Sequence, residues 1–140
     1  MPNKPIVFAL PCIVLPKGNV RNPRVVNGKI KGFYESKKSK ANDNELITLA
    51  WPYRPEKPIE GPIRVSYVFS YPYRKGDKDR DDSAYCYKLS KPDLGQLEKR
   101  MDDILKKARF INDDAQIVER GHSGRYWRKT GGIGVSIVVL

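Results

Sequence analysis

The sequence predicts a single α+β domain, residues 1–140, in which one main helix and a shorter helix pack on a mixed β-sheet. Three patterns indicate this class. Residues 63–71 (IRVSYVFSY) place apolar side chains at alternate positions, as in a strand with one buried face. Residues 94–108 repeat apolar side chains at the spacing of an amphipathic helix. Apolar segments near both ends of the chain add strands, and 140 residues are enough for one hydrophobic core.

The N-terminal half is expected to hold a strand, a basic arm and the shorter helix. Residues 6–15 are apolar and rich in β-branched side chains, which predicts a first strand. The arm from Lys17 to Lys40 contains Asn27-Gly28, a turn signal that favours a hairpin. The shorter helix is expected to begin at a cap formed by Asn42 or Asp43 and to stop before a proline-rich connection.

The C-terminal half is dominated by the main helix, which is expected to run from Asp93 to Ala108 with one apolar stripe turned to the core. A short strand is expected at residues 116–119 and a last strand at residues 135–140. Between them, residues 120–129 are interpreted as a basic loop.

The charge of the chain points to a polyanionic partner. Lys and Arg number 27 against 16 Asp and Glu, which gives a formal charge of +11. Nucleic acid is the first candidate and an acidic membrane a distant second, although solvated lysines alone would give the same composition. Aromatic residues stand among the basic residues of segment 120–129, where they could stack on bases. The residues expected to contact DNA are Lys17, Arg21, Arg24, Lys29, Lys31, Lys91, Arg125 and Lys129.

Several kinds of protein are not favoured. No apolar run approaches the roughly 20 residues of a membrane span, and no secretory cleavage site follows the N-terminal apolar segment, so a cytoplasmic protein is expected. Cys12 and Cys86 are far apart and belong to no CxxC pair, so we expect reduced thiols. With His122 as the single histidine, a zinc site is not expected. A small-molecule cofactor is not expected either.

The acidic residues of the main helix region are unusual on so basic a chain. Asp93 stands at the start of the helix, and Asp113 and Asp114 follow one helix length later. Carboxylates on a positive protein suggest Mg²⁺ held against a polyanion, because this ion prefers oxygen ligands. A helix of about 16 residues spans about 24 Å. The acids could therefore meet only through a second molecule or through a strand that turns back along the helix. The alternative is that they are capping and loop carboxylates.

The motif residues go further than this spacing. Residues 91–94 (KPDL), Lys99 and residues 113–116 (DDxQ) resemble the signature of the RusA family of Holliday-junction resolvases. The resemblance implies a homodimeric, Mg²⁺-dependent endonuclease, with Mn²⁺ as a possible substitute. It would cut four-way DNA junctions in recombination and repair, in a bacterial or phage-infected cell. It also implies that Asp93, Lys99 and Asp114 are catalytic and that Asp93 and Asp114, together with Asp113, hold the metal.

One departure from the family pattern puts cleavage in doubt. Gly95 stands where the family has a second aspartate, and Gln96 stands for an asparagine. Glu98, one helical turn from Gly95, and Asp113 are candidates to supply the missing carboxylate. Two other interpretations stay open. One is a catalytically impaired relative that binds branched DNA without efficient cleavage, and the other is a general RNA- or DNA-binding module whose acids only cap and solubilise.

Overall fold

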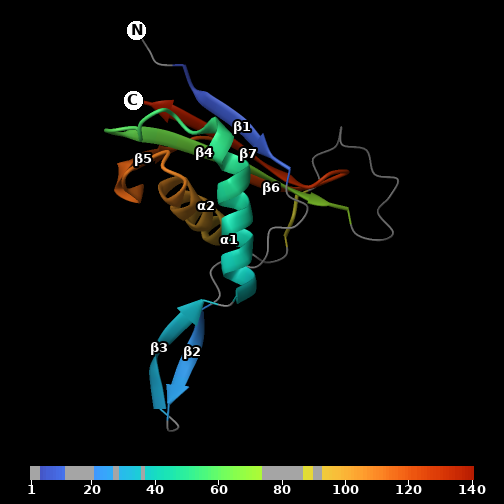
Figure 1. Cartoon of the computed structure of the whole chain (residues 1–140). Helices are drawn as coiled ribbons and strands as arrows, with labels where there is room; N and C mark the ends of the chain where they lie inside the picture. Colours follow the sequence, from blue (N-terminus) through green and yellow to red (C-terminus); the bar gives the residue numbers. More distant parts are fainter. Residues whose placement is uncertain (1–3, 12–20, 27–28, 36, 74–86, 90–92) are drawn as a thin grey trace.

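The computed structural model describes residues 4–11, 21–26, 29–35, 37–73, 87–89 and 93–140 (Figure 1). It contains a five-stranded mixed sheet, a separate two-stranded hairpin and two α-helices. The predicted α+β class is therefore confirmed. Cys12, Cys86, Lys17 and Lys91 lie outside the described residues.

The sheet is built around its longest strand, β4 (Ile63–Pro72). On one side β4 pairs antiparallel with β7 (Gly132–Val139), and β7 pairs antiparallel with β1 (Ile6–Leu10) at the edge. On the other side β5 (Ile117–Arg120) and β6 (Gly124–Arg128) run parallel to β4, one after the other along the same edge. The chain therefore leaves the edge of β4 after β5 and rejoins it at β6.

The loop that we predicted over residues 120–129 is wrong, because most of this segment is strand. In β6, Arg125 and Trp127 pair with Phe69 and Tyr71 of β4, and Tyr126 between them is buried. The two basic and two aromatic residues of segment 124–128 obscured an alternating pattern. In a parallel pair the hydrogen bonds come from the backbone, so basic side chains on either face are compatible with the strand.

The core lies between one face of the sheet and the two helices. Ile63, Val65, Tyr67 and Phe69 of β4 are fully buried, as their alternation predicted, while the residues between them are half-buried. Helix α2 (Leu94–Lys107) matches the predicted main helix within a residue at either end. Its core-facing stripe is Leu97, Met101, Ile104 and Leu105, all buried.

Helix α1 (Lys37–Ala50) begins five residues before the predicted cap, so the cap assignment is wrong. Asn42 and Asp43 lie inside the helix and contact α2 instead. Asp43 is 3% exposed and accepts a hydrogen bond of 2.9 Å from Nε of Arg100, whose Nη2 donates to Oδ1 of Asn42 at 2.9 Å. The two polar side chains that resemble a helix cap therefore fix α1 against α2. Helix α1 ends at Ala50, before Pro52 as predicted, and the short 3-10 turn η1 (Trp51–Tyr53) follows it.

The basic arm forms the predicted hairpin, with β2 (Arg21–Val26) antiparallel to β3 (Lys29–Glu35). Its turn residues lie outside the described part of the chain. Figure 1 shows the hairpin projecting away from the five-stranded sheet, beyond the start of α1. Neither helix in the described ranges is long and apolar enough to cross a membrane.

Candidate functional site

The N-terminus of α2 presents Asp93 to solvent. Asp93 is the N-cap residue, with extended backbone angles of φ −68° and ψ 153°. Its backbone N–H donates to Oε1 of Gln96 at 3.4 Å, so Gln96 helps to close this end of the helix. The carboxylate of Asp93 is exposed and meets the positive end of the helix dipole.

The solvent face of α2 carries Lys99 and Gly95. Lys99 is exposed and lies six residues after Asp93 on the same helix. A Cβ atom built on Gly95 would meet no atom within 4 Å among the described residues, so the position has room for a larger side chain. Gly95, one helical turn before Lys99, therefore leaves open space on the solvent face of α2.

The other acids lie beyond the C-terminus of α2, at the 3-10 turn η2 (Asp114–Gln116). Asp113 is the N-cap of this turn, and its carboxylate accepts a hydrogen bond of 3.1 Å from the backbone N–H of Ala115. This bond is the main cause that lowers the pKa of Asp113, and the nearby ammonium of Lys106 lowers it further. Asp114 is exposed beside it. Asp113 therefore shapes the turn that presents Asp114.

Gln116 explains the last residue of the DDxQ motif. Its Oε1 accepts from the backbone N–H groups of Asn112 and Asp113 at 2.8 and 2.9 Å. Its Nε2 donates to the backbone oxygens of Ile59 and Gly61 at 2.7 and 3.0 Å. One amide side chain thus joins η2 to the segment that precedes β4. Gln116 fixes the backbone that carries the acidic pair.

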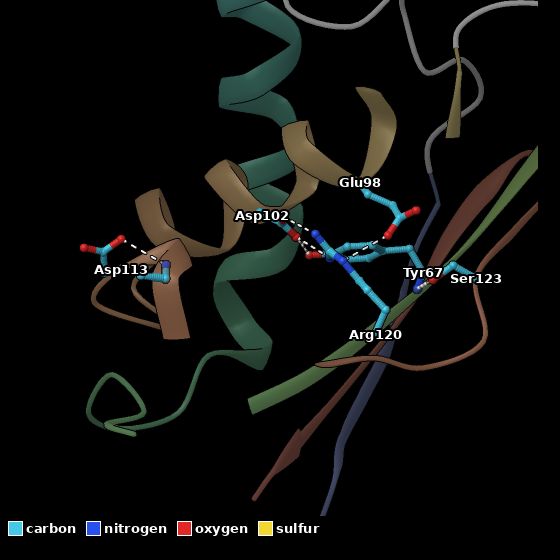
Figure 2. Close-up of polar contacts among 7 residues, drawn as sticks. Tyr67, Glu98, Asp102, Asp113, Arg120 and Ser123 are labelled. Atoms are coloured by element: carbon cyan, nitrogen blue, oxygen red, sulfur yellow. Dashed lines mark hydrogen bonds and ion pairs between the residues drawn. The ribbon is translucent and has the colours of Figure 1, made fainter. Parts of the chain in front are cut away.

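Within one chain the two groups of acids stay apart. The 14 residues of α2 span about 21 Å. Figure 2 shows Asp113 beyond the far end of the helix from Glu98. Among the described residues, no three His, Cys, Asp or Glu side chains gather closely enough to hold a metal ion. The carboxylates are the ligand type that Mg²⁺ prefers, but a single chain offers Asp93 at one end and Asp113 with Asp114 at the other.

The chain does turn back along α2 after Asp114, but it brings back a basic residue. Arg120, at the end of β5, lies between Glu98 and the buried Asp102 of α2 (Figure 2). Its Nη1 donates to Oδ1 of Asp102 at 2.8 Å, and Nη2 contacts Oδ2 of the same carboxylate. The hydroxyl of Tyr67 donates to Oδ1 of Asp102 at 2.8 Å. This network of Tyr67, Glu98, Asp102 and Arg120 attaches the main helix to the sheet.

Burial and neighbouring charges shift the pKa values of three groups in this network. Burial raises the pKa of Tyr67 well above its ordinary value, and Asp102 raises it further, so the hydroxyl remains a donor. The hydrogen bonds from Arg120 to Asp102 raise the pKa of the guanidinium. Burial also raises the pKa of Glu98, and this effect exceeds the lowering by Arg120.

The network limits the role of Glu98 and contains one residue that was not predicted. Glu98 lies 3.1 Å from Nε of Arg120, and its side chain is 15% exposed. Glu98 could therefore compensate for Gly95 only by leaving this ion pair. Sequence reasoning missed Asp102, although a carboxylate among Met101, Ile104 and Leu105 on the core-facing side of a helix requires a buried partner.

The remaining residues expected to contact DNA lie on several elements. Arg21, Arg24, Lys29 and Lys31 belong to the strands of the β2–β3 hairpin. Arg125 is half-buried in β6, and Lys129 is exposed just after it. Both of these have contacts of their own within the protein.

Comparisons with known proteins agree with the motif. A family model described as "Endodeoxyribonuclease RusA" matches residues 14–138. A protein of Lactococcus phage r1t, "Crossover junction endodeoxyribonuclease rusA", is 30% identical over 95 residues. The aligned stretch covers 66% of this chain and 66% of the phage protein.

Proposed function

Because the chain belongs to the RusA family of endodeoxyribonucleases, we propose that it is a metal-dependent endonuclease that cuts four-way DNA junctions during recombination and repair. The match to the family over residues 14–138 is the observation that carries this proposal. The name of the phage relative supports the crossover junction as substrate, and the formal charge of +11 suits a DNA partner. We assign the protein to the cytoplasm of a bacterial or phage-infected cell, where such DNA is found.

We further propose that the metal site is completed by a second copy of the chain. Asp93 and Asp114 stand at opposite ends of a helix about 21 Å long. If a second copy packs with its α2 antiparallel, Asp93 of each copy approaches Asp114 of the other. A two-fold dimer then holds two equivalent sites. A four-way junction offers two symmetric positions for cleavage, which suits such a dimer.

Each motif residue has a role in this arrangement. Asp93 and Asp114 would hold Mg²⁺, or Mn²⁺ in its place, through oxygen ligands. When bound, the ion would supply Lewis-acid activation of the phosphodiester and of the attacking water. Lys99 is exposed on the helix that Asp93 caps, so its ammonium is available to stabilise negative charge on the phosphate oxygens. Asp113 and Gln116 position Asp114 through the hydrogen bonds of η2.

Binding to the junction is assigned to the basic residues. The β2–β3 hairpin carries Arg21, Arg24, Lys29 and Lys31 on a projection away from the sheet. Such an arm can reach DNA arms beside the cleavage position. We keep Lys17, Lys91, Arg125 and Lys129 as further candidates.

The second candidate function is binding of branched DNA without efficient cleavage, and a specific observation favours it. Gly95 leaves one carboxylate fewer than the family pattern, and Glu98 is held by Arg120. Two carboxylates can still bind Mg²⁺ when water and phosphate complete the shell. The two functions therefore differ in the rate of cleavage and agree in the choice of DNA.

A cleavage assay on a synthetic four-way junction separates the candidates. The junction and a linear duplex of matching sequence are incubated with Mg²⁺ or Mn²⁺, and symmetric nicks in the junction alone are expected from an active resolvase. Tight, junction-selective binding without nicks supports the impaired relative. Equal affinity for junction, duplex and single strand would reject both and favour a general nucleic-acid binder.

Replacing Gly95 by aspartate tests the missing ligand directly. Because the position is exposed and open, Gly95→Asp should fold like the wild type and should cut the junction faster. Gly95→Asn is the matched control, since it fills the same space without the negative charge. A gain with both variants, or with neither, would contradict the assignment of this position to the metal site.

A further inference from the structure

Arg109 adopts a backbone conformation that glycine normally occupies. Its φ of 65° is the one positive φ of a non-glycine residue in the described part of the chain. The residue follows the C-cap Ala108, and the N–H of Phe110 bonds to the oxygen of Leu105 at 2.9 Å, which closes the end of α2. Glycine adopts this left-handed position without a steric cost. A long basic side chain at such a position is a reason to look for a function.

The surroundings of Arg109 hold its backbone and leave its side chain free. Phe110 and Ile111, which follow it, are buried, whereas Arg109 itself is exposed. Among the described residues, the guanidinium of Arg109 makes no ion pair or hydrogen bond. The ammonium of Lys106, also exposed at the end of α2, makes none with them either. The neighbouring Lys107, by contrast, lies 3.0 Å from Asp103.

These two cations stand at the same end of α2 as the acidic pair. Lys106 acts electrostatically on Asp113, and α2 contacts η2. Exposed carboxylates repel a DNA strand, and the C-terminus of a helix adds partial negative charge. In the absence of the metal ion, a strand approaches Asp114 against this repulsion, which nearby cations would offset.

We propose that Lys106 and Arg109 bind backbone phosphates of the DNA strand that is cut, at the end of α2 that carries Asp114. This inference rests on the proposed function. Lys106 stands in the last turn of α2 and Arg109 directly after the C-cap, so both belong to the same end of the helix. An ammonium and a guanidinium at one end of a helix can bind one phosphate or two successive phosphates, and the guanidinium can donate two parallel hydrogen bonds to a phosphate. Glycine would adopt this conformation more easily, but it would lack the phosphate contact, which accounts for arginine at position 109.

The test compares Arg109→Gly, Lys106→Ala and the double variant with Lys4→Ala. Lys4 is an exposed lysine just before β1, at the opposite edge of the sheet from β5. Binding to the four-way junction is measured by fluorescence anisotropy with EDTA at several salt concentrations. Each lost phosphate contact should reduce the slope of log K against log salt by about 0.9, and the double variant by about 1.8. Arg109→Lys should keep most of the slope.

Thermal unfolding completes the experiment. Arg109→Gly should unfold at the same temperature as the wild type or higher, so weaker binding cannot be attributed to a damaged fold. An unchanged slope in Arg109→Gly, or an equal loss in Lys4→Ala, would overturn the inference. A wild type that binds the junction but does not cut it would count against the proposed function only, because the slopes still decide the role of Arg109.

Discussion

Removing the guanidinium that neutralises Asp102 should have a large effect on stability. Asp102 is 7% exposed and receives its hydrogen bonds from Tyr67 and from two nitrogens of Arg120. Arg120→Met leaves a buried carboxylate with one donor, which typically costs about 3–5 kcal/mol. Because the side chain of Arg120 is 38% exposed, water can replace part of the interaction, so we expect about 3 kcal/mol. For a chain of this length that corresponds to a fall in Tm of about 10 °C.

The assay is urea and thermal unfolding at pH 7, with a second variant as control. The triple variant Tyr67→Phe, Asp102→Leu, Arg120→Met replaces the whole polar group by apolar side chains. It should recover most of the lost stability, because the cost comes from the unpaired charge rather than from the missing ion pair. A loss below about 1 kcal/mol in Arg120→Met, or a triple variant that is no more stable than the single one, would refute this view of the network.

Three further outcomes follow from the same geometry. Burial raises the pKa of Glu98 above its ordinary value of 4.5, so Glu98 stabilises the fold below that pH and loses this contribution as the pH rises through the raised pKa. The free energy of unfolding of Glu98→Gln, measured in urea titrations, should therefore rise relative to that of the wild type as the pH increases from 4.5 to neutrality. A difference between the two proteins that stays constant with pH would contradict the raised pKa. Gln116→Ala should cost about 1–2 kcal/mol and should also weaken cleavage, because the turn that presents Asp114 loses four hydrogen bonds. Lys99→Met should reduce the single-turnover rate of cleavage about 100-fold with an unchanged Tm. A lowered Tm alongside the slower cleavage would indicate a structural role for Lys99.

The sequence predicted the elements whose periodicity is local. The alternation at residues 63–71 and the apolar stripe at residues 94–108 correspond to β4 and α2, because one face of each element is buried in the core. Helix α1 was placed too late, since its first turns (KKSKAN) contain no apolar pattern. The strand β6 was missed because its identity depends on pairing with β4, which lies more than 50 residues earlier.

The sequence predicted a set of candidate site residues and only part of their geometry. The resemblance to the family motif indicated Asp93, Lys99 and Asp114, and the expected helix of about 16 residues already separated the acids by about 24 Å within one chain. The structure confirms a helix between them, of 14 residues. The buried network could not be found, because Arg120 reaches Asp102 only after the chain turns back along α2. A long-range contact of this kind depends on the packing of β5 against β4 and leaves no local pattern in the sequence.

The central claim is that Asp93 of one copy and Asp114 of another share a metal ion, and subunit mixing tests it directly. Asp93→Asn and Asp114→Asn proteins are prepared separately, mixed under conditions that exchange subunits, and assayed for nicks in the four-way junction. Each variant alone should be inactive, while the mixed dimer contains one site with both acids intact and should nick one strand. If the wild type cuts and the mixed dimer stays as inactive as either variant alone, the acids do not act across two copies.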